Sequence, residues 1–186
     1  MTLHIKDKIG ITTVDTAMGW IGIAWSARGL AAVTLPQPTR AAALSQIPPA
    51  SDPAPPTPVG LDVTALAAKL RRYFGGEAVI LDELLDPTIG TPFQRQVWTI
   101  TRAIPRGQTR TYGEIAREAG SPDAARAVGQ AMARNPWPVI VPCHRVVGSD
   151  RRLTGFGGGL EMKREMLTME GAITNLTPPG KDGMIV

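Results

Sequence analysis

The segment from Asn135 to Val147 reads NPWPVIVPCHRVV and holds the only cysteine of the chain. Prolines bracket a short apolar run of β type, and Pro142 restricts the backbone immediately before Cys143. A thiol is a strong nucleophile only as the thiolate, which needs a neighbour that lowers its pKa. His144 is adjacent, but neighbouring side chains of a regular strand point to opposite faces. Cys143 is therefore either an inert core residue, or a nucleophile that His144 reaches through a backbone turn or a bridging water.

Upstream of this segment the sequence predicts short helices. Thr91-Pro92 opens a helix that extends to about Ala103. Thr111 is placed to cap a helix over residues 112–119. Ser121-Pro122 combines a capping residue with proline, and we expect it to start another helix that ends near Arg134. The two helices joined at Gly120-Ser121 form a candidate helix-turn-helix.

The second of these helices is rich in small residues, among them Ala125, Ala127 and Gly129. Small residues let a helix backbone approach another surface closely. One interpretation is tight packing against a neighbouring helix. The other is a helix that lies in a nucleic-acid groove, with Arg126 projecting from it.

The first half of the chain indicates β structure followed by a helix. Runs rich in Val, Ile, Thr and Trp at residues 9–16, 19–26 and 30–35 predict an antiparallel meander. Residues 48–58 hold six prolines and predict a loop, because proline interrupts both helices and central strands. Residues 61–74 show the apolar spacing of a helix.

These patterns predict an α+β protein. We expect an N-terminal domain at residues 1–90, in which a β-meander is joined by a helix. A helical domain with a winged-helix-like helix-turn-helix follows at residues 91–171, and a tail at residues 172–186.

Charge is unevenly spread along the 186 residues, whose formal net charge is +4. Residues 93–171 hold twelve Lys and Arg against seven Asp and Glu, and eleven of the twelve are Arg. Arginine suits phosphate geometry, so this surplus is compatible with a polyanionic partner, although an ordinary solvated surface would look the same.

One cysteine and two histidines exclude a multi-cysteine zinc site and argue against a His-rich metal site, so we expect no metal. No apolar run has the length of a membrane helix, and no apolar segment follows the first charged residues. We therefore expect a protein without a membrane or targeting segment, located in the cytoplasm or at the nucleoid.

The string Pro142-Cys143-His144-Arg145-Val146 resembles the active-site signature of the O6-alkylguanine-DNA alkyltransferases, also called methylated-DNA–protein-cysteine methyltransferases. Further blocks resemble that family in the same order. They are residues 93–98, 104–107, 112–116, 124–129, 135–136 and 155–160. The resemblance is strong over about residues 93–171, whereas the first 90 residues match only in architecture.

The resemblance implies direct-reversal DNA repair, in which an alkyl group moves irreversibly from O6 of guanine in duplex DNA to Cys143. O4-methylthymine is a second candidate substrate. His144 would act on Cys143 through a water, and Glu170 would orient His144. Tyr112 would donate a proton to the departing guanine, and Asn135 would brace the turn that presents the thiol.

The resemblance also implies the DNA contacts. Arg126 would take the place of an extruded nucleotide, since a stacked base is out of reach of a protein thiol. Ala125, Ala127 and Gly129 would let the same helix enter the minor groove with little sequence preference. Val146, Gly157 and Gly158 would line the base pocket, in which Phe156 stands where many relatives carry Tyr. We expect a monomer that needs no cofactor.

Two other functions remain open. A non-catalytic relative would bind alkylated DNA and recruit other repair proteins, but such proteins replace the acceptor cysteine, commonly with Trp. A cysteine hydrolase would use Cys143 and His144, and it would need an oxyanion hole and a base with direct reach.

Overall fold

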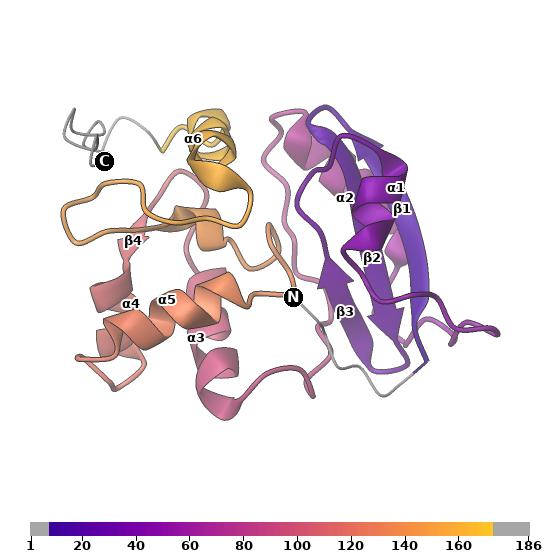
Figure 1. Ribbon diagram of the computed structural model, residues 1–186, viewed down its shortest axis with the longest axis horizontal. Helices are drawn as coiled ribbons and strands as arrows, with labels where there is room; N and C mark the ends of the chain where they lie inside the picture. The colour runs from indigo at the N-terminus through magenta and orange to yellow at the C-terminus, as the bar shows by residue number, and fades with distance from the viewer. Residues whose placement is uncertain (1–7, 173–186) are drawn as a thin grey trace, which may run out of the picture.

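The computed structural model describes residues 8–172, and Figure 1 shows two halves side by side. The N-terminal half holds a three-stranded antiparallel sheet of β1 (Gly10–Thr16), β2 (Gly19–Ser26) and β3 (Gly29–Val33), in that order. The predicted meander is confirmed, although β3 ends two residues earlier than expected. Gly29 has a φ of 154°, and a Cβ there would lie 2.7 Å from the backbone of Leu85, so the turn before β3 requires glycine.

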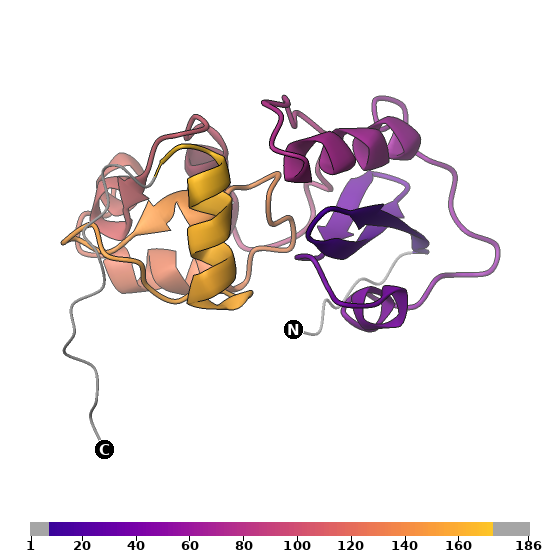
Figure 2. The ribbon, with the colours of Figure 1, turned by 90° about the horizontal axis from the view of Figure 1, so that it is seen from above.

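One helix covers each face of this sheet, as Figure 2 shows. The predicted helix is α2 (Val63–Phe74), which begins after the cap Asp62 and buries Leu66, Leu70, Tyr73 and Phe74. The other helix, α1 (Arg40–Ser45), was not predicted, because six residues give too short a pattern to detect. The proline-rich residues 48–58 form neither helix nor strand, as expected.

The C-terminal half contains four helices among the described residues. They are α3 (Pro92–Arg102), α4 (Tyr112–Glu118), α5 (Ala125–Ala133) and α6 (Gly159–Met169). Thr91 and Thr111 cap α3 and α4, each in a reciprocal pair of hydrogen bonds with the residue three positions later. Between the helices, β4 (Arg110–Thr111) pairs in parallel with β5 (Val146–Val147).

The predicted start of the second helix of the helix-turn-helix is wrong. Helix α5 begins at Ala125 with Ala124 as its N-cap, and no side chain caps it. The carbonyl of Ser121 instead accepts a hydrogen bond from the backbone N–H of Ala124, which closes a separate turn over residues 121–124. A capping residue followed by proline fits such a turn as well as a helix start.

The two halves share one hydrophobic core, and the segment before Cys143 connects them. The indole N–H of Trp137 donates to the carbonyl of Leu30 in β3 over 2.7 Å, and both residues are buried. The backbone N–H of Val33 donates to the carbonyl of Pro136 over 2.8 Å. Trp137 also packs edge-on against Trp98 of α3, with the ring centroids 5.3 Å apart. The approach to the cysteine is therefore anchored on the sheet.

Candidate active site around Cys143

Cys143 begins a single 3-10 turn, η1 (Cys143–Arg145), directly after Pro142. The backbone thus turns at the thiol, so Cys143 and His144 are not held on opposite faces of a strand. The side-chain amide of Asn135 supports the loop that runs from Asn135 to Cys143. Its Nδ2 donates to the carbonyl of Val141 over 2.8 Å, and its Oδ1 accepts from the backbone N–H of Trp137 over 3.0 Å. The loop is strained, because Val139 has a φ of 76°, which a β-branched residue rarely adopts.

A cavity of about 440 Å³ opens beside Cys143. Its walls come from both halves of the molecule. They include Leu35, Tyr112, Gly129, Met132, Asn135, Cys143, Phe156 and Gly157. The size lies within the usual range of small-ligand sites, and the wall is mainly apolar with a few polar groups.

Of the three residues predicted for the base pocket, Gly157 lies in this wall, whereas Val146 and Gly158 do not; the predicted catalytic residue Tyr112 also lies in it. Tyr112 begins α4, and its hydroxyl accepts a hydrogen bond from Thr154 over 3.3 Å. Gly157 lies against Leu35, since a Cβ on Gly157 would be 3.7 Å from that side chain. Val146 is fully buried in β5 and does not border the cavity. Gly158 also lies outside the wall, where it packs between Leu35 and Met162.

His144 belongs to a buried cluster of polar side chains behind the thiol. Its Nε2 lies 3.0 Å from Oε1 of Glu170, the residue that caps the C-terminus of α6. Arg145 donates to both oxygens of the same carboxylate over 2.8 Å. The hydroxyl of Tyr73 donates to Oε1 of Glu170 over 2.6 Å. Three residues thus donate four hydrogen bonds to one carboxylate. We call these residues together with Glu170 the Glu170 cluster, which comprises Glu170, His144, Arg145 and Tyr73.

The Glu170 cluster determines which nitrogen of His144 carries the proton. A carboxylate accepts hydrogen bonds, so Nε2 is the protonated nitrogen of the neutral imidazole. His144 Nδ1 is buried and has no hydrogen-bond partner within residues 8–172. Its lone pair is therefore available to accept a proton, directly or through a water.

Burial and charge set the protonation states at pH 7. Burial lowers the pKa of His144, although the neighbouring Glu170 opposes this shift, and the ring stays neutral. Burial alone would raise the pKa of Glu170, but the hydrogen bonds from His144 and Arg145 outweigh it and hold the pKa far below its ordinary value. Burial raises the pKa of the Cys143 thiol, and a hydrogen bond with Asn135 and the charge of Lys163 counteract part of that rise.

Lys163 supplies that positive charge from a fully buried position on α6. Its Nζ donates to the carbonyl of Val146 over 2.6 Å and to the carbonyl of Thr154 over 3.0 Å. Burial lowers the pKa of Lys163 to about 8, against the opposing influence of Cys143. The ammonium group thus holds β5 and the loop after it close to α6, and it favours the thiolate.

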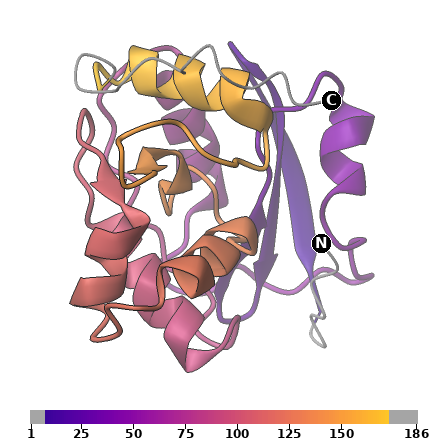
Figure 3. The same cartoon turned by 60° about the vertical axis from the view of Figure 1, so that its left-hand side comes forward.

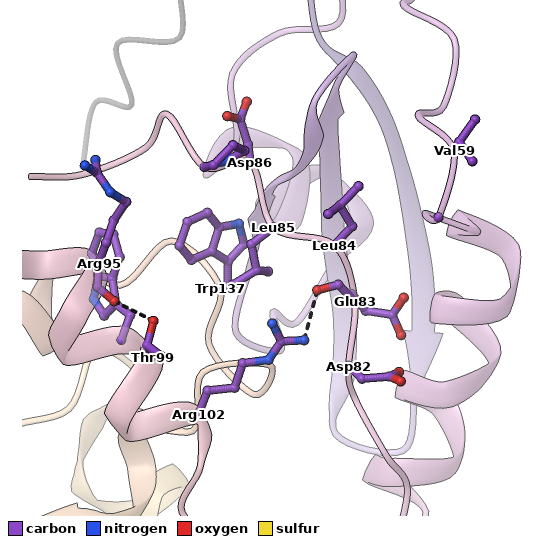
Figure 4. A pocket seen from close by; sticks show the side chains of 13 residues that line it. Val59, Asp82, Glu83, Leu84, Leu85, Asp86, Arg95, Thr99, Arg102 and Trp137 are labelled. Atoms are coloured by element: carbon purple, nitrogen blue, oxygen red, sulfur yellow. Dashed lines mark hydrogen bonds between the residues drawn. The ribbon is translucent and has the colours of Figure 1, made fainter. Parts of the chain in front are cut away.

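A second cavity, of about 650 Å³, lies between α3 and the segment 82–87. Figure 4 shows Arg95 and Arg102 of α3 on one side, Leu84 on the other, and Trp137 between them. Arg102 donates to the carbonyls of Leu81 and Glu83 over 3.2 and 2.9 Å. The residues that line this cavity include neither cysteine nor histidine, whereas Cys143 lies in the wall of the first cavity.

No group of three or more His, Cys, Asp and Glu residues within residues 8–172 is arranged to hold a metal ion. No helix in the same range has the length and apolar character needed to cross a membrane.

Residues 92–172 match the family described as 6-O-methylguanine DNA methyltransferase, DNA binding domain. The crystal structure of the O6-methylguanine methyltransferase of Mycobacterium tuberculosis is 37% identical to this chain. The alignment covers 88% of this chain and 93% of that one, with a TM-score of 0.69. This chain belongs to the methylated-DNA–protein-cysteine methyltransferase family.

A second structure of the same M. tuberculosis protein and one further relative are also similar to this chain. A structure of the M. tuberculosis protein in complex with DNA is 39% identical to this chain, covers 86% of it and 91% of that chain, and gives a TM-score of 0.68. The methylated-DNA–protein-cysteine methyltransferase of Shigella flexneri is 50% identical over 106 residues, which are 57% of this chain and 62% of that relative. The match to this curated relative thus spans about three fifths of its length. The mixed α+β fold is that of the structurally solved family members.

The family's DNA-binding domain includes the α4–α5 pair. Val128, Ala131 and Met132 of α5 are buried, so this face of the helix packs against the core. Arg126 and Ala127 are exposed on the other face, while Ala125 and Gly129 are half-buried. The side chain of Arg126 makes no hydrogen bond or ion pair with residues 8–172. The packing interpretation of the small residues thus holds for one face of α5 only.

Sequence reasoning missed three residues of this methyltransferase site. Arg145 lies inside the quoted signature, where it was given no role. Lys163 is three and four residues from the buried apolar residues Met166 and Leu167, so its place on the buried face of α6 was detectable. Tyr73 had no such signal, since it is 97 residues from Glu170 and sits among apolar residues of α2.

Proposed function

We propose that this chain repairs alkylated DNA by moving a methyl or larger alkyl group from O6 of guanine to Sγ of Cys143. The observation that supports this most directly is a cysteine at the wall of a cavity, backed by a buried His144 whose Nδ1 is an unused acceptor. In the reaction, the bond between Sγ and the alkyl carbon forms while the bond from that carbon to O6 breaks. The electron pair stays on the guanine, and the thiol proton leaves through His144.

His144 acts as the base in this proposal, and Glu170 holds it in the correct tautomer. The logic is that of a nucleophile, a base and a third group that orients the base. Glu170 also balances the positive charge that develops on the imidazole. Tyr112, which lines the cavity, returns a proton to guanine as the alkyl group departs. Asn135 keeps the loop before Cys143 in place through its two backbone hydrogen bonds.

DNA binding is assigned to the exposed face of α5. We propose that this face enters the minor groove of duplex DNA, because Ala127 is small and exposed, so the helix backbone can approach the groove closely. Arg126 enters the base stack and fills the space of the extruded alkylguanine. One monomer suffices, since the cavity and the Glu170 cluster are both built from a single chain. The domain boundary near residue 90 stays a prediction.

Stoichiometry tests the proposed reaction most directly. A thioether has no good leaving group, and the chain has no second cysteine that could remove the alkyl group from Cys143. Repair should therefore stop after about one alkyl group per protein molecule at any excess of substrate. Methylated oligonucleotide is titrated against a fixed amount of protein, restored guanine is counted, and the mass of the intact protein is measured.

Three results of this titration have different meanings. A gain of one alkyl mass on Cys143, in step with restored guanine, supports the transfer. Turnover beyond one equivalent with unchanged protein mass would indicate a hydrolase instead. Binding of alkylated DNA with no repair at all would indicate a non-catalytic relative.

Arg126→Ala tests the assignment of the DNA-binding face. Without the guanidinium, the extruded nucleotide has no replacement in the stack, and unstacking a base costs a few kcal/mol. We expect repair of duplex DNA to slow on the order of 10²-fold. The reaction with free O6-benzylguanine should change less than about twofold, because a free base needs no extrusion. Single-turnover rates on both substrates provide the measurement.

Arg164→Ala is the matched control for Arg126→Ala. Arg164 is an exposed arginine on α6, which Figure 3 shows on the opposite side of the C-terminal half from α4 and α5. Arg164→Ala lowers the net charge by the same amount as Arg126→Ala. It should leave the rates on duplex DNA and on free O6-benzylguanine close to those of wild type. Equal losses on duplex DNA and on the free base in Arg126→Ala would show that Arg126 does not assist extrusion.

A further inference from the structure

Tyr73 is the only member of the Glu170 cluster that comes from the N-terminal half. It lies in the last turn of α2, is 2% exposed, and reaches across to the end of α6. Its ring packs edge-on against Phe74, and the guanidinium of Arg106 lies 5.7 Å from its centroid. A phenylalanine would satisfy these ring contacts equally well. The hydroxyl therefore needs an explanation of its own.

The hydroxyl of Tyr73 is placed between the two groups that prepare the thiol. It donates its proton to Oε1 of Glu170 over 2.6 Å, and its oxygen lies 3.3 Å from Nε2 of His144. Since its single proton is committed to the carboxylate, only its lone pairs can face the imidazole. Nε2 of His144 thus meets two acceptors, Oε1 of Glu170 and Oη of Tyr73. Both favour the tautomer in which Nε2 is protonated and Nδ1 is free.

We propose that Tyr73 is a positioning residue for alkyl transfer, whose hydroxyl holds Glu170 and His144 in the arrangement that leaves Nδ1 of His144 free as a proton acceptor. This inference rests on the proposed function, because it assigns the residue that tunes the base in that reaction. It also gives the N-terminal half a chemical role, since the sheet and α2 deliver a group to the relay that no residue of the matched DNA-binding domain supplies.

The charged and titratable groups around His144 fix the direction of the expected effect. They are Glu170 and Lys163 from α6, Arg145 and Cys143 from η1, and Tyr73 from α2. Burial and the charge of Glu170 keep Tyr73 protonated, because both raise its pKa. If the hydroxyl is removed, Glu170 loses a close donor, so its charge is balanced more by His144. The protonated imidazole becomes more favourable, the pKa of His144 rises, and the base works only at higher pH.

Tyr73→Phe is the test, because it removes one oxygen and keeps the ring. We expect the single-turnover rate constant at saturating alkylated duplex to fall about tenfold, as the loss of a hydrogen bond to a charged group predicts. The oligonucleotide concentration for half-maximal rate should not change, since Tyr73 is buried and touches no proposed DNA contact. The pH midpoint of the rate should move upward. The rate with free O6-benzylguanine should fall by the same factor.

Leu66→Val in the same helix is the control for a purely structural effect. Leu66 is fully buried in α2 and takes no part in the Glu170 cluster. Its shortening should lower the melting temperature yet leave the rate constant and its pH midpoint unchanged. The proposed role of Tyr73 is overturned if Tyr73→Phe lowers the melting temperature as Leu66→Val does but keeps the wild-type rate constant and the wild-type pH midpoint.

Alkylation of Cys143 by iodoacetamide separates this inference from the proposed function, because it reports the nucleophile without DNA. If wild-type protein takes no alkyl group from DNA but Tyr73→Phe still slows the reaction of Cys143 with iodoacetamide about tenfold, the proposed function fails, and only the effect of Tyr73 on the reactivity of the thiol stands. If wild-type protein repairs DNA and Tyr73→Phe matches it in both assays, the proposed function stands and the role of Tyr73 fails.

Discussion

Cys143→Ser is expected to lower alkyl transfer by at least about 10³-fold, below the detection limit of most assays. Serine has nearly the size of cysteine, so the cavity and the turn around residue 143 keep their shape. A hydroxyl is a far weaker nucleophile than a thiol and is not ionised by a neutral histidine to a useful extent. Transfer of radiolabel from methylated DNA to protein, followed over hours, gives the rate.

Duplex binding provides the internal control for Cys143→Ser. The DNA contacts are proposed for α5, and residue 143 lies behind them in η1, so affinity for alkylated duplex should stay within about twofold of wild type. The affinity of both proteins should fall steeply with salt, because arginine contacts release counterions from phosphates. Label transfer at a rate near that of wild type would exclude Cys143 as the acceptor.

Glu170→Gln is expected to cause the largest combined loss of activity and stability. Glutamine keeps the size of the side chain but can accept at one terminal atom only, whereas Glu170 accepts at both oxygens from His144, Arg145 and Tyr73. The amide NH₂ therefore meets another donor. The tautomer of His144 loses its support, and comparable amide substitutions at a base-orienting carboxylate slow catalysis by up to about 10⁴-fold. We expect a fall on the order of 10³-fold in the single-turnover rate.

The stability effect of Glu170→Gln follows from Arg145. The side chain of Arg145 is 11% exposed, and its guanidinium would lose its carboxylate partner. Leaving a buried charge unpaired costs about 3–5 kcal/mol, which corresponds to roughly 10 °C in melting temperature for a chain of this size. Thermal unfolding by circular dichroism at pH 7 measures it. Glu165→Gln, an exposed position of the same helix, should change neither rate nor stability.

Acid should reduce the difference between wild type and Glu170→Gln. The pKa of Glu170 is lowered in the folded protein, so the folded state binds this proton less readily than the unfolded state does. The stabilisation is complete above the ordinary carboxyl pKa of about 4.3 and is lost as the pH falls below it. A gap in melting temperature that stays constant from pH 7 to pH 3 would show that the charge of Glu170 contributes little.

Local signals in the sequence predicted most of the helices and strands. The meander, α2, and the caps Thr91 and Thr111 were all predicted, because strand alternation, turn glycines and capping residues act within a few positions. The start of α5 was not, since Ser121-Pro122 satisfies a turn and a helix start equally. The choice between them depends on how the turn packs, which lies outside the local pattern.

The candidate site shows the same division between local and distant information. Cys143, His144 and Asn135 lie within ten positions, and the signature around them predicted a reactive thiol. The resemblance to relatives supplied Glu170, whose place beside His144 depends on α6 folding back across the loop. Neither the local pattern nor the resemblance predicted the role of Tyr73. An aromatic residue on the apolar face of α2 gives no sign that its hydroxyl donates to a carboxylate 97 positions away.

Leu35 shows that the cavity beside Cys143 is walled by two separate segments of the chain. It follows β3 in the N-terminal half, and Gly157 and Gly158 lie against it without side chains of their own. The wall of the cavity proposed to receive the alkyl group is thus shared between a segment near residue 35 and the loop at residues 155–157. A chimaera that exchanges only the first 90 residues would inherit a different limit on alkyl size while retaining the same helices for DNA. A change at residue 35 would then alter the space for an alkyl group without altering the helix proposed to enter the DNA.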